Sequence, residues 1–318
     1  MRRCAILLGV VSLLVPITAY AQAPTPEAAL NLFKNAMKKT GNGDLDGAIE
    51  DYTRAIRLSS TFDTRKGSRA SNSFAEGSDA TTEGITVIDP FTANAYNNRG
   101  LARYRKGDYN GAIDDFNAAL RIRPGLETAY LNRAAARRAS GDMKAALEDL
   151  NRAIALKKDF SQAYNNRGSL HLDLGNTDAA LTDLNRAIEL NDRVAETFYQ
   201  RGYLYLSLKN FDSAIADFER AIKVEPKMAW AYQGKGTAWM HKGMMTNAIK
   251  DFDRAIELDP KMAWAYFNRG LIWVFMGEES LGEKDFAECL RLRPELKSEL
   301  DPRIELARHL RRIGQPLF

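Results

Sequence analysis

Cysteine is nearly absent from this sequence. Two of the 318 residues are cysteines, and Cys4 lies in an N-terminal segment that we expect to be removed, which leaves Cys289 alone. A single thiol cannot form an internal disulfide, and this excludes the disulfide-stapled folds that are common among small exported proteins. Cys289 stands at a position of a repeat, described below, that otherwise holds alanine, so we expect it to be buried and unreactive. The fold must therefore be stabilised by packing.

Residues that usually carry catalysis are scarce as well. The three histidines, His171, His241 and His309, have no metal-ligand spacing around them, and the sequence has neither a glycine-rich phosphate loop nor a serine elbow. These observations predict no metal, no cofactor and no enzymatic activity. The 45 basic residues nearly balance the 41 acidic ones, for a net charge of +4. No basic stripe indicates nucleic-acid binding.

The first 21 residues differ from the rest of the chain. Two arginines precede an apolar run over residues 4–18, which is followed by Ala19-Tyr20-Ala21. A basic start, a short apolar centre and a small-residue end are the parts of a secretory signal peptide. We expect cleavage after Ala21, a short linker over residues 22–28 and no transmembrane span in the mature chain, because the apolar run is too short to cross a bilayer comfortably. Export with one thiol favours the bacterial periplasm; an uncleaved membrane anchor is the alternative.

A 34-residue repeat dominates the remaining sequence. AYNNRG at residues 95–100 returns at 163–168, with close variants at 129–134 and 265–270. Each unit holds two amphipathic helical patterns separated by a break, such as KGDY at 106–109. One such hairpin cannot bury its own apolar face, so neighbouring hairpins must stack. The small residues that mark the 34-residue spacing are Gly100, Ala134, Gly168, Gly202, Gly236 and Gly270.

The order of Tyr, Gly or Ala, Ala, Phe or Leu, Ala and Pro over 34 residues resembles the tetratricopeptide repeat family. The resemblance covers residues 93–296 as six consecutive units, and residues 29–62 fit as a first unit. It implies an all-α, right-handed superhelical solenoid of antiparallel helix pairs with about seven units. We expect residues 297–318 to form a C-terminal capping helix whose polar face meets solvent.

Residues 63–92 interrupt the repeat between its first two units. The stretch 59–84 is rich in serine, threonine and glycine and lacks a sustained apolar period. We therefore expect a flexible insertion, followed by a lead-in to the second unit. Phe62 and Phe74 leave open that the insertion acts as a lid over a groove.

A basic residue precedes the marker glycine or alanine of each of the six units, where the family usually packs an aliphatic side chain. An aspartate follows sixteen residues later, and the first unit, with Asn35 instead of the base, keeps Asp51. Because an unpaired charge between helices is unfavourable, we expect ion pairs that join the two helices of each hairpin, bidentate where the base is arginine. A row of guanidinium groups that binds an anionic ligand is the alternative. The expected pairs are Arg99 with Asp115, Arg133 with Asp149, Arg167 with Asp183, Arg201 with Asp217, Lys235 with Asp251, and Arg269 with Asp285.

The resemblance further implies that the first helix of each unit lines a concave ligand groove. The groove positions hold carboxamides in most units, with a break at Gly234, and aromatic residues in the later units. A carboxamide both donates and accepts hydrogen bonds, so a row of them can pair with the backbone of an extended peptide, as in some tetratricopeptide superhelices. The alternative is that these carboxamides connect neighbouring helices. The expected groove residues are Asn97, Asn98, Asn132, Asn165, Asn166, Gln200, Tyr199, Tyr203, Trp230, Trp264, Phe267 and Asn268.

Together these features predict an exported scaffold or adaptor whose partner is another protein, bound through an extended peptide in the concave groove. The aromatic residues of the later units would supply contact area, because aromatic side chains dominate binding hot spots. Two alternatives stay open. One is a carbohydrate or cell-wall ligand on the aromatic half of the groove, and the other is an architectural subunit of an envelope complex. Nothing in the repeat indicates an oligomeric state.

Overall fold

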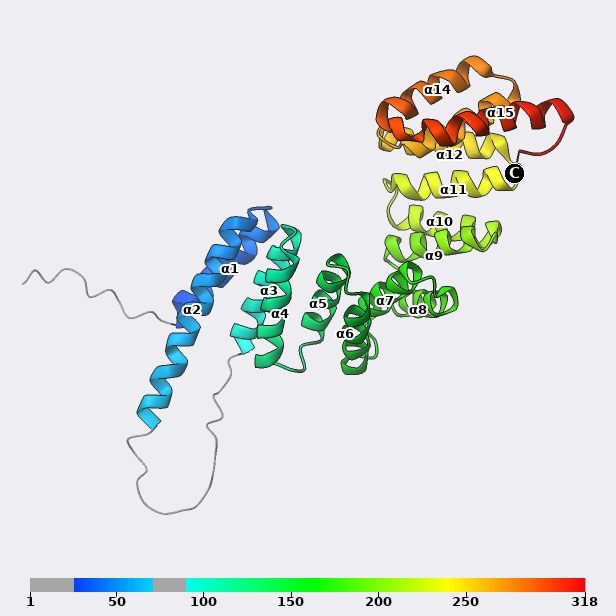
Figure 1. The fold of residues 1–318 in the computed structure, drawn as a ribbon. Helices are drawn as coiled ribbons and strands as arrows, with labels where there is room; N and C mark the ends of the chain where they lie inside the picture. Colours follow the sequence, from blue (N-terminus) through cyan, green and yellow to red (C-terminus); the bar gives the residue numbers. More distant parts are fainter. Residues whose placement is uncertain (1–25, 71–89, 318) are drawn as a thin grey trace, which may run out of the picture. The chain divides into compact units, whose positions relative to one another are not determined.

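The computed structural model describes residues 26–70 and 90–317, which form helices joined by short turns (Figure 1). Fifteen α-helices and one 3-10 turn make up this part of the chain, and no strand occurs in it. The predicted all-α class is confirmed. The described residues form two compact units, one that ends at residue 124 and one that begins at residue 125. The predicted signal peptide at residues 1–21 lies outside the described residues.

No helix within residues 26–70 and 90–317 combines the length and the apolar character that a membrane span requires.

The first compact unit, which ends at residue 124 and is larger than one repeat, consists of two helical hairpins. Ala36 and Ala48 are fully buried where the first two helices approach each other, and the Tyr52 ring fills the space beside them. The Phe33 ring contacts both Tyr52 and Phe91, with centroid distances of 5.6 and 5.1 Å, and so joins the two hairpins. The four helices are α1 (Pro26–Gly41), α2 (Leu45–Ala70), α3 (Pro90–Arg105) and α4 (Tyr109–Ile122).

The predicted flexible insertion begins later than expected, because α2 continues through residues 59–70. The packed part of α2, where Tyr52 and Ala55 are buried, nucleates the helix. Each further residue then adds one backbone hydrogen bond at little extra cost. Residues 59–70 contain no proline that would stop it. At the other end of the insertion, α3 starts at Pro90, where a first-turn proline is well tolerated. The rest of the insertion, residues 71–89, lies outside the described residues.

The second unit stacks five hairpins in sequence order. In the first four, two alanines of the second helix are fully buried, as at Ala146 and Ala153. A large apolar side chain such as Leu184, Phe218 or Phe252 fills the space between the helices. The ten helices are α5 (Glu127–Ala139), α6 (Met143–Leu156), α7 (Ser161–Asp173), α8 (Thr177–Leu190), α9 (Ala195–Ser207), α10 (Phe211–Val224), α11 (Ala229–His241), α12 (Met245–Leu258), α13 (Ala263–Met276) and α14 (Glu279–Leu292).

The first helices of neighbouring hairpins in the second unit contact one another: α5 with α7, α7 with α9, α9 with α11, and α11 with α13. A stack of hairpins curves toward the side on which its helices approach each other most closely, and that side is concave. We call the side of the second unit formed by α5, α7, α9, α11 and α13 the concave face.

A further helix, α15 (Lys297–Ile313), caps the end of the second unit by packing on α13. Leu300 and Ala307 of α15 are buried in one cluster with Phe267 of α13, and Leu317 from the C-terminal tail joins the same cluster. The predicted capping helix is therefore attached through an apolar contact of its own, which hides the last hairpin from water.

The polar side of α15 forms ion pairs with the last hairpin. Arg308 and Arg311 both pair with Glu279 of α14, at 2.9 and 3.3 Å. The Arg311 guanidinium also donates to the Val274 carbonyl at 2.9 Å. Arginine side chains are long enough to reach a neighbouring helix while their stems cover apolar surface. These two arginines hold the cap in place.

One hairpin turn departs from its neighbours. Lys209 joins α9 to α10 with a φ of 58°, in the left-handed region that costs a residue with a β-carbon about 1–2 kcal/mol. The corresponding turns of the neighbouring hairpins use Gly175 and Gly243, both with a φ of 74°. Lys209 therefore stores local backbone strain that glycine would release.

We expect Lys209→Gly to stabilise the protein by roughly 0.5–1 kcal/mol, since the released strain exceeds the extra chain entropy of glycine. Urea unfolding followed by circular dichroism measures the change. Lys209→Ala is the matched control, because it removes the charge and keeps the β-carbon. An equal gain from alanine would show that charge, and not backbone strain, explains the effect.

Candidate functional site

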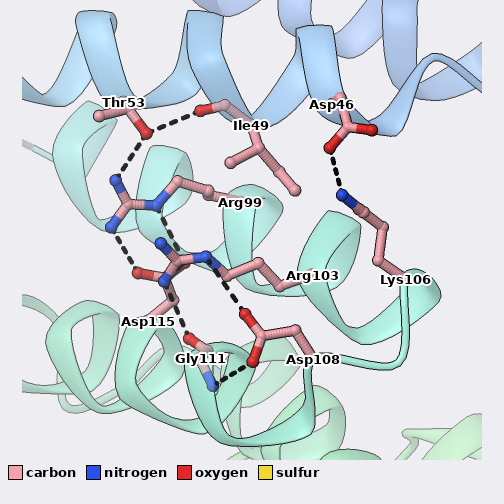
Figure 2. A network of polar contacts seen from close by, with 9 residues as sticks. All are labelled: Asp46, Ile49, Thr53, Arg99, Arg103, Lys106, Asp108, Gly111 and Asp115. Carbon is pink, nitrogen blue, oxygen red and sulfur yellow. Dashed lines mark hydrogen bonds and ion pairs between the residues drawn. The ribbon is translucent and has the colours of Figure 1, made fainter.

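The repeated arginine binds the aspartate of the following helix with two parallel hydrogen bonds. Arg99 of α3 donates from Nε to Asp115 Oδ2 at 2.9 Å and from Nη2 to Oδ1 at 2.6 Å (Figure 2). Asp115 is only 2% exposed. The two hydrogen bonds from Arg99 therefore replace those that the carboxylate would form with water. The same fork joins Arg133 to Asp149, Arg167 to Asp183, Arg201 to Asp217, and Arg269 to Asp285. The structure thus brings together each of the predicted arginine–aspartate pairs.

The remaining nitrogen of the guanidinium reaches a third helix. Arg99 Nη1 donates to Thr53 Oγ1 of α2 at 2.9 Å, and Thr53 in turn donates to the Ile49 carbonyl (Figure 2). In the second unit, the acceptor lies on the second helix of the preceding hairpin, sixteen residues before the arginine. Sequence reasoning missed this regular spacing, through which Arg167, Arg201 and Arg269 tie their own hairpins to the ones before. The pairs in the second unit are Arg167 with Asn151, Arg201 with Asn185, and Arg269 with Asp253.

Two hairpins use lysine in place of the fork. Lys235 lies 3.2 Å from Asp251 and 3.9 Å from Glu219 of the preceding hairpin. Burial raises the pKa of Asp251, and the single ammonium of Lys235 opposes this shift only in part. In the first hairpin, which lacks a basic residue at the repeated position, Lys39 one turn later contacts Asp51 at 2.7 Å. This partner was also missed, because it breaks the sixteen-residue spacing.

The forks neutralise the charge of the arginines that form them. Hydrogen bonds to Asp183 and Asp217 raise the pKa of Arg167 and Arg201 and outweigh the opposing effect of burial. A guanidinium that is held by a carboxylate has little attraction left for another anion. The geometry therefore favours a structural role for the repeated arginines over a row of anion-binding groups.

Removing one partner of a fork should destabilise the protein more than removing both. Asp183→Leu leaves the Arg167 guanidinium between the helices without its carboxylate, and we expect the free energy of unfolding to fall by about 3 kcal/mol. Adding Arg167→Leu should recover most of the loss, because an apolar pair then replaces the ion pair. Urea unfolding of the single and double variants tests this. Equal losses in both would contradict the pairing.

In the first compact unit, the two asparagines that were predicted to line the groove take part in packing. Asn97 is 8% exposed, and its Nδ2 donates to Asn98 Oδ1 at 3.2 Å. Burial raises the pKa of Tyr52, while hydrogen bonds with Thr40 and Asn98 oppose the shift. The Asn98 carboxamide is therefore engaged by neighbouring side chains. These two residues fit the alternative in which carboxamides connect helices.

In the second unit, the predicted carboxamides belong to the first helices and so to the concave face. The Oδ1 atom of Asn165 and the Oε1 atom of Gln200 are buried and have no hydrogen-bond partner in the described part of the chain. A buried polar atom without a partner is unusual in a folded protein. Because neither atom reaches solvent, a donor from outside the unit can pair with it only after the carboxamide side chain turns. The half-buried members of the set are Asn132, Asn165, Asn166 and Gln200, and Asn268 is buried.

The carboxamide row breaks at Gly234, where the Phe218 ring fills the space of a side chain. A β-carbon on Gly234 would lie 2.5 Å from the Phe218 ring of the preceding hairpin, closer than van der Waals contact permits. Phe218 is fully buried and also lies near Gly202, where a β-carbon would be 3.0 Å away. Phe116 and Phe252 hold the same repeat position before Asn132 and Asn268, so the phenylalanine alone does not account for the missing carboxamide.

Most of the predicted aromatic groove residues are accessible. Tyr203 is 44% and Trp230 is 50% exposed, and the Tyr199 and Tyr203 rings lie 5.4 Å apart. Trp264 is half-buried, with its ring 5.0 Å from that of Phe267. Phe267, predicted to line the groove, is instead fully buried. In the last hairpin, α15 packs over the position that Phe267 occupies and takes its ring into the core.

A cavity of about 230 Å³ lies on the concave face next to the cap. Gln233 and Asn268 contribute carboxamides that are 5% and 9% exposed. Sequence reasoning included Tyr203, Trp264 and Asn268 among the groove residues, but it did not connect Arg303 with them, because Arg303 belongs to the cap and lies outside the repeat. The lining residues are Tyr203, Gln233, Thr237, Met240, His241, Trp264, Asn268 and Arg303.

The lone thiol does not line this cavity. Cys289 is fully buried, and burial raises its pKa to about 11, so the thiol stays protonated at neutral pH. Within the described ranges, no cluster of three His, Cys, Asp or Glu residues is arranged to hold a metal ion.

The sequence matches the tetratricopeptide repeat family at residues 93–126, 127–160, 161–193, 195–228 and 231–262, just over half of the 318 residues. The chain therefore belongs to the tetratricopeptide repeat family. Residues 29–62 and 263–296, the remaining predicted units, have the same paired-helix form. Proteins of this family are scaffolds for protein–protein interaction and are typically not enzymes.

Three solved structures show the same architecture. A tetratricopeptide repeat protein from Parabacteroides merdae ATCC 43184 is 20% identical, with a TM-score of 0.57 over 90% of this chain and 99% of that one. The APC/C hetero-tetramer Cut9–Hcn1 is 19% identical, with a TM-score of 0.60 over 67% of this chain; the match spans 42% of the other chain. YrrB, a repeat protein described as having an unusual peptide-binding site, is 19% identical, with a TM-score of 0.50 over 62% and 97%. At these identities the likeness shows the fold.

Proposed function

We propose that this protein is an exported scaffold that binds an extended peptide segment of a partner protein on the concave face of its second unit. The observation that carries the proposal is the pair of buried acceptors, Asn165 Oδ1 and Gln200 Oε1, which have no partner within the described residues. They stand on adjacent first helices, α7 and α9. Backbone N–H groups of an extended chain can satisfy both acceptors once the two carboxamide side chains turn toward the concave face.

Side chains around these acceptors support a peptide ligand. Tyr203 and Trp230 expose about half of their surfaces beside the carboxamides of α9 and α11. Aromatic side chains offer large contact area with few rotatable bonds, and this makes them frequent hot spots. The carboxamides would hold the backbone and the aromatic rings would contact the side chains. YrrB, which has the same fold, is described as having an unusual peptide-binding site, and this supports the proposal of a peptide ligand.

A second candidate is a carbohydrate ligand on the aromatic part of the same face. Trp230 is 50% exposed and Trp264 borders the cavity next to the cap, and flat aromatic faces can pack against sugar rings. Binding of purified glycans by the mature chain, in the absence of any protein, would favour this candidate. Competition by unstructured peptides would favour the first.

A displayed library of unstructured peptides, selected on the mature chain, tests peptide binding. We expect Asn165→Ala, Asn166→Ala and Gln200→Ala together to weaken every selected peptide by roughly a hundredfold, at about 1 kcal/mol for each lost hydrogen bond. Because the carboxamides contact the backbone, the loss should be similar for peptides of unrelated sequence. Fluorescence anisotropy with labelled peptides measures the dissociation constants.

Two controls separate the concave face from a general loss of structure. Lys144→Ala, Glu148→Ala and Thr182→Ala change exposed residues of the second helices, α6 and α8, and should leave peptide binding unchanged. Arg167→Leu should also leave it unchanged, because the arginine serves the hairpin and not the ligand. Circular dichroism must first show equal helicity for all variants. Unaltered binding by the carboxamide variant would contradict the proposal.

Export is tested separately. Expression of the full chain in a bacterial host should give a periplasmic product that begins at Gln22, since the small residues before it form the cleavage site. Intact mass and N-terminal sequencing of the periplasmic fraction measure this. A full-length product held in the membrane would support the uncleaved anchor, and a full-length product in the cytoplasm would contradict export.

A further inference from the structure

The cavity next to the cap contains a cation that no acidic residue neutralises. Arg308 and Arg311, on the same helix, pair with Glu279, whereas Arg303 has no carboxylate partner in the described part of the chain. Its guanidinium lies over the Phe267 ring, 5.7 Å from the centroid. This cation–π contact and the anchored cap hold the group at the cavity wall.

The remaining polar groups of the cavity are neutral. Gln233 and Asn268 are more than nine-tenths buried, so their carboxamides are held in place by packing. Burial raises the pKa of Tyr203, and a hydrogen bond with Gln233 partly opposes this shift. Thr237 donates its hydroxyl to the backbone carbonyl of Gln233 at 3.0 Å. Two carboxamides and a phenol thus line the cavity beside the guanidinium.

The electrostatic field in the cavity is positive. No aspartate or glutamate belongs to its lining. The His241 ring, which stacks on Phe211 at 5.2 Å, has a lowered pKa, first because of burial and then because of the charges of Lys209 and Arg303. Positive charge that disfavours protonation of a histidine favours the entry of an anion.

We propose that this cavity binds the carboxylate of an acidic side chain, aspartate or glutamate, with Arg303 as its charged partner. The identity of the chain that carries this residue rests on the proposed function. A guanidinium and a carboxylate can form two parallel hydrogen bonds, and the carboxamides can supply further donors. Side chains of an extended segment alternate between two directions, so one acidic residue can enter the cavity while the backbone stays on the concave face. Met240 and Trp264 provide apolar wall for its methylene groups.

Small probes test the cavity without a peptide. The mature chain is titrated with N-acetyl-glutamate N-methylamide, with the matching glutamine compound, and with N-acetylglycine as a terminal carboxylate. Chemical shifts of the Trp264 indole N–H and the Arg303 Nε–H report occupancy. We expect the glutamate compound to bind about tenfold more tightly than the other two. Arg303→Gln should weaken the glutamate compound by about tenfold, and Arg303→Lys by less, since lysine keeps the charge but not the fork.

Arg312→Gln is the matched control, because Arg312 is exposed on the same helix and does not line the cavity. It should leave the titration unchanged. Equal binding of the glutamate and glutamine compounds, no effect of Arg303→Gln, or no shift at the highest soluble concentration would each overturn the proposal. Tighter binding of N-acetylglycine would overturn it in favour of a chain terminus. If the library yields no peptide that binds the unmutated chain while the glutamate compound still binds, only the proposed function is contradicted.

Discussion

The three-helix contact of the repeated arginine is the interaction on which the stack of hairpins depends. Apolar burial drives the helices together but has little directional preference. The guanidinium, by contrast, has a planar fork that matches a carboxylate in one orientation. Arg167 holds Asp183 in its own hairpin and Asn151 in the hairpin before. One side chain therefore sets both the spacing within a hairpin and the alignment of two neighbours.

This arrangement also shapes the binding surface. Because the repeated arginines are used inside the stack, the concave face of the second unit offers carboxamides and aromatic rings instead of a row of charges. Neutral groups of this kind suit a ligand held through its backbone. The cap then adds charge at one place: Arg303 reaches the cavity from outside the repeat. A row of carboxamides and aromatic rings with a cationic cavity at one end would combine general backbone affinity with a preference at one position.

The irregular hairpins show how neighbouring residues compensate for a departure from the repeat pattern. At Gly234, which interrupts the carboxamide row, the Phe218 ring occupies the space that a β-carbon would need. Lys235 replaces the fork with one ammonium, and burial raises the pKa of its partner Asp251. In the first hairpin, Lys39 reaches Asp51 from one turn away. Each change is compensated by its immediate neighbours, as expected for a fold in which a repeat contacts only the adjacent ones.

The sequence by itself determined the helical hairpins, their 34-residue spacing and the arginine–aspartate pairs, because all of these depend on residues at fixed distances within one hairpin. It also indicated which carboxamides belong to the first helices. Only the tertiary structure decided that Arg167 reaches Asn151, that Phe267 is buried and that Arg303 completes a cavity. These outcomes depend on how one hairpin, or the cap, packs on another, and the helical period of a segment carries no information about the partner that will cover it.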